Sequence, residues 1–142
     1  MSKGLLDVNV LLALLDPDHR DHHRAHQWAE EGLSAGWSTC ALTENGLVRI
    51  LSQPSYPNPV SPDQAVSLLR RATTHPGHEF WPCDLSITGG RFAPRHLVGH
   101  RQLTDAYLLG LAVHHDGTFV TFDRRVDPAV VAGGKPSHLT VI

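Results

Sequence analysis

Four acidic side chains stand at comparable places in the sequence. Asp7 and Asp123 each follow a short apolar run typical of a buried strand, whereas Glu44 and Asp105 lie in the first turn of expected helices. Burying a lone carboxylate is costly, so an acid directly after a buried strand needs a physical reason. In a parallel α/β sheet, the carboxyl ends of strands and the starts of the following helices share one edge. We therefore expect the four acids to converge.

Converging carboxylates repel one another unless a cation lies among them. A pocket of several charged oxygens suits Mg²⁺, with Mn²⁺ as a plausible substitute, better than it suits zinc. Such an ion can orient a phosphodiester, lower the pKa of a water molecule and stabilise the departing oxygen. The pattern predicts metal-assisted hydrolysis of nucleic acid and is compatible with either one ion or two.

Four neighbouring residues could support this site. Asn9 could orient the first of the four acids or contact a metal-bound water, and an ordinary first-turn asparagine is an equally good interpretation. Arg124 and Arg125 directly follow the last acid and could hold nucleic-acid phosphates, although arginines in loops are usually only exposed. Thr121 is a further candidate for indirect support or phosphate contact.

The elements that must position these residues alternate along the chain. Strands are expected over residues 3–7, 36–40, 78–82, 118–122 and 139–142. Helices are expected over residues 8–15, 22–33, 42–51, 62–72 and 104–113. Thr43, Ser61 and Thr104 are the expected caps of the last three helices. This alternation predicts an α/β fold with a mostly parallel central sheet of about five strands, covered by helices on both faces.

Length and composition limit the choice of protein class. The 142 residues are 41% hydrophobic, which is enough for the core of one domain over residues 1–142. A formal net charge of −2 gives no general attraction for a polyanion, so any nucleic-acid contact must be local. Cys40 and Cys83 stand far apart and do not indicate a disulfide framework. With no signal-like or membrane-spanning stretch, a soluble cytoplasmic protein without a membrane partner is expected.

Structural interpretations compete with the functional one. Asp7 could simply cap a helix, and Glu44 and Asp105 could complement helix dipoles, which is worth roughly 0.3 to 1 kcal/mol each. Six other aspartates are interpreted as having turn, cap or loop roles: Asp16, Asp18, Asp63, Asp84, Asp116 and Asp127. Four acids in equivalent places make capping alone a poor explanation for the set.

A histidine cluster near the first helix raises the question of zinc. His22 and His26 are spaced to share one helical face, but the zinc-protease pattern H-E-x-x-H requires a glutamate where His23 stands. We therefore interpret the cluster, which also includes His19, as a solvated face that could contact a partner.

Taken together, four segments resemble those of PIN-domain ribonucleases, and more narrowly the VapC-type toxins of bacterial toxin–antitoxin pairs. The segments are LLDVNVLLAL, LTENGLVRIL, RQLTDAYLLGLAV and TFVTFDRR. The resemblance covers nearly the whole chain in the same order, and the acidic quartet of the family falls on Asp7, Glu44, Asp105 and Asp123. It implies a three-layer α/β/α fold, Mg²⁺-dependent cleavage of RNA, dimers, and inhibition by a small antitoxin whose tail enters the active groove.

Two other functions remain open at this point. A phosphatase that forms an aspartyl phosphate on Asp7 would usually need an aspartate two residues later, and Asn9 stands there. A binding or regulatory protein that has kept only the fold would have no need to retain all four acids. The sequence does not identify which RNA is cut.

Overall fold

The computed structural model describes residues 2–142, which are built around one five-stranded sheet. The strands are β1 (Gly4–Leu6), β2 (Trp37–Cys40), β3 (His78–Trp81), β4 (Thr118–Thr121) and β5 (Leu139–Val141). They lie in the order β3-β2-β1-β4-β5, and each neighbouring pair is parallel. The predicted parallel sheet of about five strands is confirmed.

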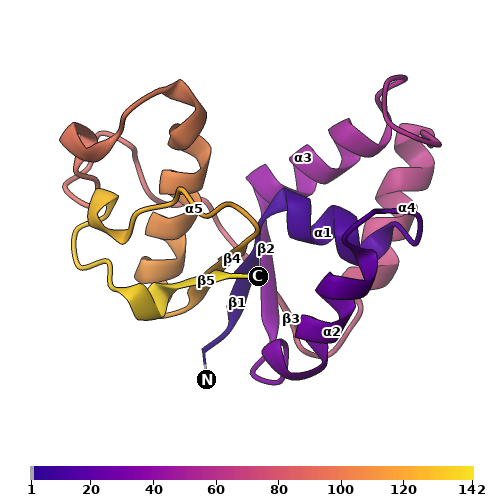
Figure 1. The fold of residues 1–142 in the computed structure, drawn as a ribbon, viewed down its shortest axis with the longest axis horizontal. Coiled ribbons are helices and arrows are strands. Elements are labelled where there is room, and N and C mark those ends of the chain that lie inside the picture. The colour runs from indigo at the N-terminus through magenta and orange to yellow at the C-terminus, as the bar shows by residue number, and fades with distance from the viewer. Residues whose placement is uncertain (1) are drawn as a thin grey trace.

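Helices cover both faces of this sheet. They are α1 (Val8–Leu15), α2 (His22–Gly32), α3 (Ala41–Leu51), α4 (Pro62–Thr73) and α5 (Leu103–His114). Short 3₁₀ turns are η1 (Pro94–His96), η2 (His100–Gln102), η3 (Pro128–Val130) and η4 (Pro136–His138). α1 to α4 lie on one side of the strands and α5 lies on the other, which gives the three expected layers (Figure 1). Within residues 2–142, no helix has the length and apolar character needed to cross a membrane.

The central strand β1 is buried on both faces. Leu5 packs into a cluster with Phe119 and the apolar side chains of α5. Leu6 packs into a second cluster with residues of α1, α3 and α4. Both leucines are fully buried, because a parallel sheet covered by helices on both sides leaves its inner strands no contact with water.

α5 is buried around most of its circumference, as its sequence predicts. Seven residues between Ala106 and Val113 are buried. The long connection from β3 to α5 crosses this helix through Phe92, which forms an isolated antiparallel bridge with Val131. Gly110 allows this close approach, since an added Cβ there would lie 2.6 Å from Phe92 Cε1. The helix therefore has packing partners on both sides.

The structure corrects two of the three predicted helix caps. α3 begins directly after β2 with Cys40 as its N-cap, and Thr43 is the third helical residue, whose hydroxyl accepts from the Cys40 amide at 3.0 Å. α5 continues from the 3₁₀ turn η2 and has Gln102, not Thr104, at its cap position. Ser61 is confirmed as the cap of α4. Both errors arise because the preceding element runs into the helix without a break.

The histidine cluster is structural in part, which the expectation of a solvated face did not include, although His23 and His26 are both exposed. A ring nitrogen of His22 lies 2.7 Å from the carbonyl oxygen of Ala13, and one of His26 lies 2.9 Å from that of Leu14. These carbonyls belong to the last turn of α1, where helical acceptors lack partners within the helix. The two imidazoles therefore fasten α2 to the end of α1.

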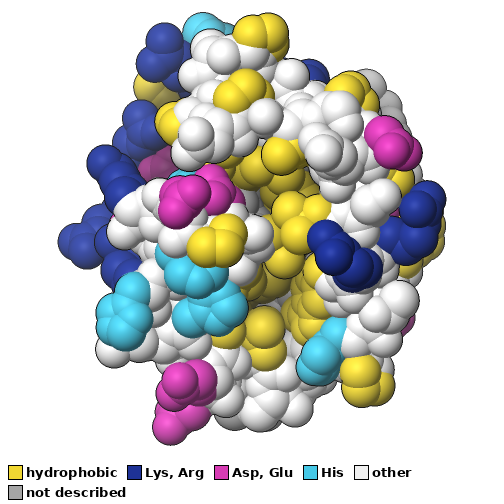
Figure 2. Space-filling view, turned by 90° about the vertical axis from the view of Figure 1, so that its right-hand side faces the viewer, with side chains coloured by type: hydrophobic (Ala, Val, Ile, Leu, Met, Phe, Trp, Pro, Cys, Tyr) yellow, Lys and Arg dark blue, Asp and Glu magenta, His cyan; other side chains and the backbone are white. Residues whose placement is uncertain are grey.

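One face of the molecule, over α2 and α4, is hollowed and largely apolar. Figure 2 shows this face with hydrophobic side chains along the floor of the hollow. The hollow has a volume of about 460 Å³, and its lining includes Leu11, Leu14, Leu33, Trp37 and Ala72.

Candidate active site

Asp7 uses its two carboxylate oxygens for different purposes. Oδ1 accepts from the Val8 amide at 2.8 Å, so Asp7 is the N-cap of α1. Oδ2 accepts from the Thr121 hydroxyl at 2.7 Å. The residue is only 6% exposed, and this burial raises the pKa of Asp7 despite the opposing effect of both hydrogen bonds. Capping thus accounts for one oxygen and does not explain the burial of the other.

Thr121 links two of the acids. It is fully buried at the end of β4, next to β1 in the sheet. Its hydroxyl donates to Asp7 and accepts from the amide of Asp123 at 3.0 Å. A single hydroxyl therefore fixes the position of Asp7 relative to the backbone that carries Asp123.

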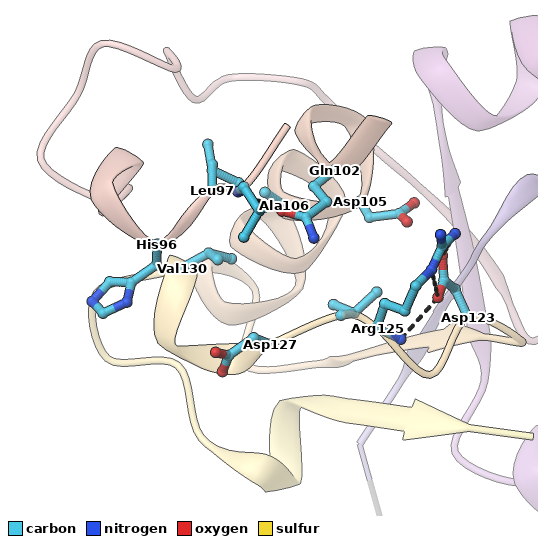
Figure 3. Close-up of a pocket in the computed structure, with 11 residues that line it drawn as sticks. His96, Leu97, Gln102, Asp105, Ala106, Asp123, Arg125, Asp127 and Val130 are labelled. Atoms are coloured by element: carbon cyan, nitrogen blue, oxygen red, sulfur yellow. Dashed lines mark hydrogen bonds and ion pairs between the residues drawn. The ribbon is translucent and has the colours of Figure 1, made fainter. Parts of the chain in front are cut away.

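Asp105 extends from the first turn of α5 toward the same place. Burial, followed by the negative charges of Asp7 and Asp123, raises the pKa of Asp105 to about 6. In Figure 3 the carboxylate of Asp105 points toward the pair formed by Asp123 and Arg125. The three aspartates come from distant parts of the chain and lie close enough for their charges to interact.

Arg125 holds Asp123 through a two-pronged ion pair. Its Nε donates to Asp123 Oδ1 at 3.0 Å and its Nη2 donates to Oδ2 at 2.9 Å. These hydrogen bonds lower the pKa of Asp123. Both residues, with Asp105, line a pocket of about 160 Å³ (Figure 3). Asp127 lines it too, and its carboxylate accepts from the Ala129 amide at 2.9 Å, which confirms its predicted loop role.

Glu44 is held by β2 and β3. Its Oε2 accepts from the Thr39 hydroxyl at 2.6 Å, and the Thr39 oxygen lies 2.8 Å from Nε2 of His78. Because the hydroxyl proton is directed to Glu44, Nε2 of His78 must be the donor of the second bond. Burial lowers the pKa of His78, while the charge of Glu44 opposes this effect. The result is a chain of hydrogen bonds from β3 through β2 to the start of α3.

The donor chemistry of the acids fits a hard divalent cation, but their present arrangement does not surround one: the three aspartates act on one another electrostatically, and Glu44 is not among the charges that shift their pKa values. Among residues 2–142, no three of the four acids have oxygens that all lie within 4.8 Å of one another. Binding an ion would require the carboxylates to move inward and Arg125 to release Asp123. All the donors are oxygens, and a cation would relieve the repulsion and desolvation that raise the pKa values of Asp7 and Asp105.

A family model described as the PIN domain matches residues 4–130, which include all four acids. The chain belongs to the PIN-domain family. Ribonuclease VapC44 of Mycobacterium tuberculosis is 51% identical over 141 residues, which cover 99% of each chain. Ribonuclease VapC39 of the same species is 40% identical over 132 residues, or 92% of this chain and 95% of the relative. These matches make the chain a VapC-type PIN domain.

A solved structure shares the fold of this PIN domain. It is VapBC2 from Rickettsia felis, bound to a DNA fragment from the promoter of that pair. The TM-score is 0.55, with coverage of 86% of this chain and 88% of the other. At 11% sequence identity this likeness concerns the fold alone.

Sequence reasoning anticipated some of the residues around this candidate site and did not anticipate others. Asn9 and Arg124, two of the expected neighbours, are exposed beside it. Thr39 and His78 were missed. A buried hydroxyl within a strand covered on both faces was a usable signal for Thr39, since such a group needs a partner. No signal identified His78, because the sequence does not show which strand lies beside β2.

Proposed function

We propose that this VapC-type PIN domain is a metal-dependent endoribonuclease, the toxin component of a VapBC-like type II toxin–antitoxin module. The observation that carries the proposal is the meeting of Asp7, Asp105 and Asp123 at one edge of the sheet, where their negative charges act on one another. The relatives named as VapC ribonucleases support the reaction class.

Four acids are proposed to hold the cation, Mg²⁺ with Mn²⁺ as a substitute: Asp7, Glu44, Asp105 and Asp123. When bound, the ion supplies positive charge that stabilises the phosphodiester oxygens as the bond breaks. Thr121 keeps Asp7 in a fixed orientation, and the hydrogen bonds from Thr39 do the same for Glu44. Without a metal the pKa of Asp105 is raised to about 6, and a bound cation would lower it again and keep the carboxylate ionised as a ligand.

Arg125 is proposed to exchange partners during substrate binding. Its guanidinium forms two hydrogen bonds with Asp123 and is exposed, so it can turn to an RNA phosphate with little rearrangement. Arg124, the adjacent exposed residue, provides a second charge for the phosphate backbone. With Asn9 at the rim, these side chains would position the RNA without selecting its sequence.

The decisive experiment replaces Asp7 and Asp105 separately by asparagine. Asparagine can still cap α1, so the Asp7→Asn variant should fold while losing its negative charge. Cleavage of total RNA in Mg²⁺ should be abolished in both variants and retained in Asp18→Asn, the same change at an exposed loop aspartate. Thermal unfolding would confirm that the variants are folded. Full cleavage by both site variants would refute the assignment.

The proposed toxin also requires partners. A small cognate antitoxin would hold the nuclease inactive in the cytoplasm, where its RNA substrate lies, and a homodimer is a further prediction from the family. Co-expression with the product of a neighbouring small gene, followed by size-exclusion chromatography, tests both. Separate elution of the two products would contradict the proposed pair, and a monomeric toxin would contradict the dimer.

A further inference from the structure

Two imidazoles and a carboxylate meet at the far end of α5. His114 is the last residue of this helix, His115 follows it, and Asp84 lies in the connection after β3. One ligand atom from each residue lies within 4.8 Å of the other two, and within residues 2–142 this is the one group of three histidine, cysteine or acidic side chains so arranged. Nine residues of helical rise, about 13.5 Å, separate His114 from Asp105.

The ring of His115 is held in place, but one of its nitrogens lacks a hydrogen-bond partner. Its Nε2 atom is buried and has no partner among residues 2–142. Its ring stacks on Trp81, with ring centres 4.4 Å apart and planes inclined by 13°. Leaving a buried polar atom without a hydrogen-bond partner destabilises the fold. This nitrogen is the one that we assign to a ligand, because coordination would satisfy it without moving the ring off Trp81.

The other two side chains have room to close around an ion. Nε2 of His114 lies 3.7 Å from Oδ2 of Asp84, and their side chains are 32% and 50% exposed. Donors around a tetrahedral zinc-like ion lie about 3.3 to 3.5 Å apart. The separation of this pair is therefore close to the one that an ion requires, and rotation of the His114 and Asp84 side chains can bring them toward His115.

In the present arrangement Arg91 opposes the binding of a cation at His114. Its Nη2 lies 3.2 Å from Nδ1 of His114. A guanidinium can only donate, so Nδ1 accepts and the proton of the neutral ring is on Nε2, facing Asp84. An ion at Nε2 would displace that proton and leave Nδ1 protonated, which would require the exposed Arg91 side chain to move away. Removing Arg91 should therefore strengthen binding.

We propose that Asp84, His114 and His115 bind a zinc-class divalent cation at a site separate from the nuclease carboxylates. Two imidazole nitrogens with one carboxylate oxygen suit Zn²⁺ or Co²⁺ rather than Mg²⁺, and three protein ligands leave one position for water. The ion fastens the connection between β3 and α5 to the end of that helix. The far end of the same connection lines the pocket that contains Asp105 and Asp123.

The test is metal titration of the untagged full chain with excess Mg²⁺ present. Zn²⁺ binding is followed by calorimetry and Co²⁺ binding by its visible absorption. We expect one ion per chain and displacement of Co²⁺ by Zn²⁺. A chain that binds neither metal in the hundred-micromolar range would overturn the proposal.

Variants assign the ion to this site. Asp84→Asn and His115→Phe, which keeps an aromatic ring on Trp81, should each weaken Zn²⁺ binding by at least about tenfold. Arg91→Gln should strengthen it severalfold. His26→Gln, which removes a histidine from the distant α1–α2 junction, should leave it unchanged. Unchanged affinity in both ligand variants, or weaker binding in Arg91→Gln, would contradict the assignment.

Two further controls test whether a loss of Zn²⁺ binding is due to unfolding of a variant or to binding at the nuclease carboxylates. Thermal unfolding without metal shows whether His115→Phe is folded. Asp84 is exposed, so Asp84→Asn decides the question even if the histidine variant is unstable. Asp105→Asn should bind Zn²⁺ with the affinity of the unmodified chain. Loss of Zn²⁺ binding in Asp105→Asn would place the ion at the nuclease carboxylates and overturn the proposal.

Discussion

At the residue scale, the candidate nuclease site consists of carboxylates in unfavourable surroundings. Burial raises the pKa values of Asp7 and Asp105, whereas hydrogen bonds from Arg125 lower that of Asp123. Asp7 and Asp105 therefore bind a proton more tightly than an ordinary aspartate, whereas Asp123 binds it less tightly. At neutral pH the buried acids therefore reduce the stability of the metal-free fold, as groups that bind a charged ligand often do.

Replacing Asp105 by asparagine should stabilise the metal-free protein at pH above 6. The folded-state pKa of Asp105 is raised to about 6 from an ordinary value of 3.8, so the folded protein binds the proton more tightly than the unfolded chain. The fold therefore loses stability as the pH rises through this window. Thermal unfolding with a chelator present should show a higher Tm for Asp105→Asn one or two pH units above 6, with the difference shrinking toward pH 4. A difference independent of pH would contradict the shift.

Removing the hydroxyl of Thr121 should damage the site more than the fold. Thr121→Val keeps the side-chain shape but leaves Asp7 Oδ2 and the Asp123 amide without their shared partner, at a cost of roughly 1 to 3 kcal/mol. RNA cleavage should fall strongly while the chain remains folded. Thr121→Ser restores the hydroxyl and should recover most of the activity. Equal activity in the valine and serine variants would show that the hydroxyl is dispensable.

At the element scale, the strand and helix pattern was predictable, and the places where elements join were less so. All five strands and all five helices lie where periodicity and turn residues place them, because a sheet buried on both faces requires uninterrupted apolar runs such as Leu5-Leu6. The caps at Thr43 and Thr104 were mispredicted because those helices continue directly from β2 and η2. Cap propensity describes only a helix that begins after a break.

The three convergent aspartates could be foreseen, but their neighbours could not. The shared edge of parallel strands and following helices brings Asp7, Asp105 and Asp123 together whatever the loops do. The contact of Glu44 with Thr39 depends on a side-chain rotamer. The grouping of Asp84 with His114 depends on the path of a long connection, for which the sequence carries no periodic signal.

The packing of α5 against the connection after β3 can be tested by comparing two glycine-to-alanine substitutions. Gly110→Ala would place a Cβ 2.6 Å from Phe92 Cε1 and should destabilise the fold by roughly 1 to 3 kcal/mol, less any gain in helix propensity. Gly99→Ala meets no atom within 4 Å and should change stability by no more than about 0.5 kcal/mol. Denaturant unfolding of both variants measures the difference. Equal stability would mean that Phe92 moves aside freely.

At the scale of the whole molecule, charge gives little general attraction for RNA. With a net charge of −2, binding must depend on a few local cations such as Arg124 and Arg125. Two phosphate contacts predict a slope of about −1.4 for the logarithm of the binding constant against that of the salt concentration, from about −0.7 per contact on a single strand. Fluorescence anisotropy with the inactive Asp7→Asn variant measures it.

Variants of the two arginines provide the check on this slope. Arg124→Ala should make it shallower by about 0.7, the contribution of one lost phosphate contact. A slope steeper than about −4 in the unmodified chain would show that many more basic side chains contact the RNA than these two.

The burial of α5 also constrains how such a protein can diverge. The middle of the helix contacts core side chains around most of its circumference, so most substitutions there would lower stability whatever they might add chemically. Its tips are freer to vary, and they are also where Asp105 and the pair His114-His115 are placed. Changes in metal preference or substrate specificity are therefore expected to arise by substitutions at the two ends of α5 and in the adjoining loops. The middle of the helix should remain conserved among related proteins.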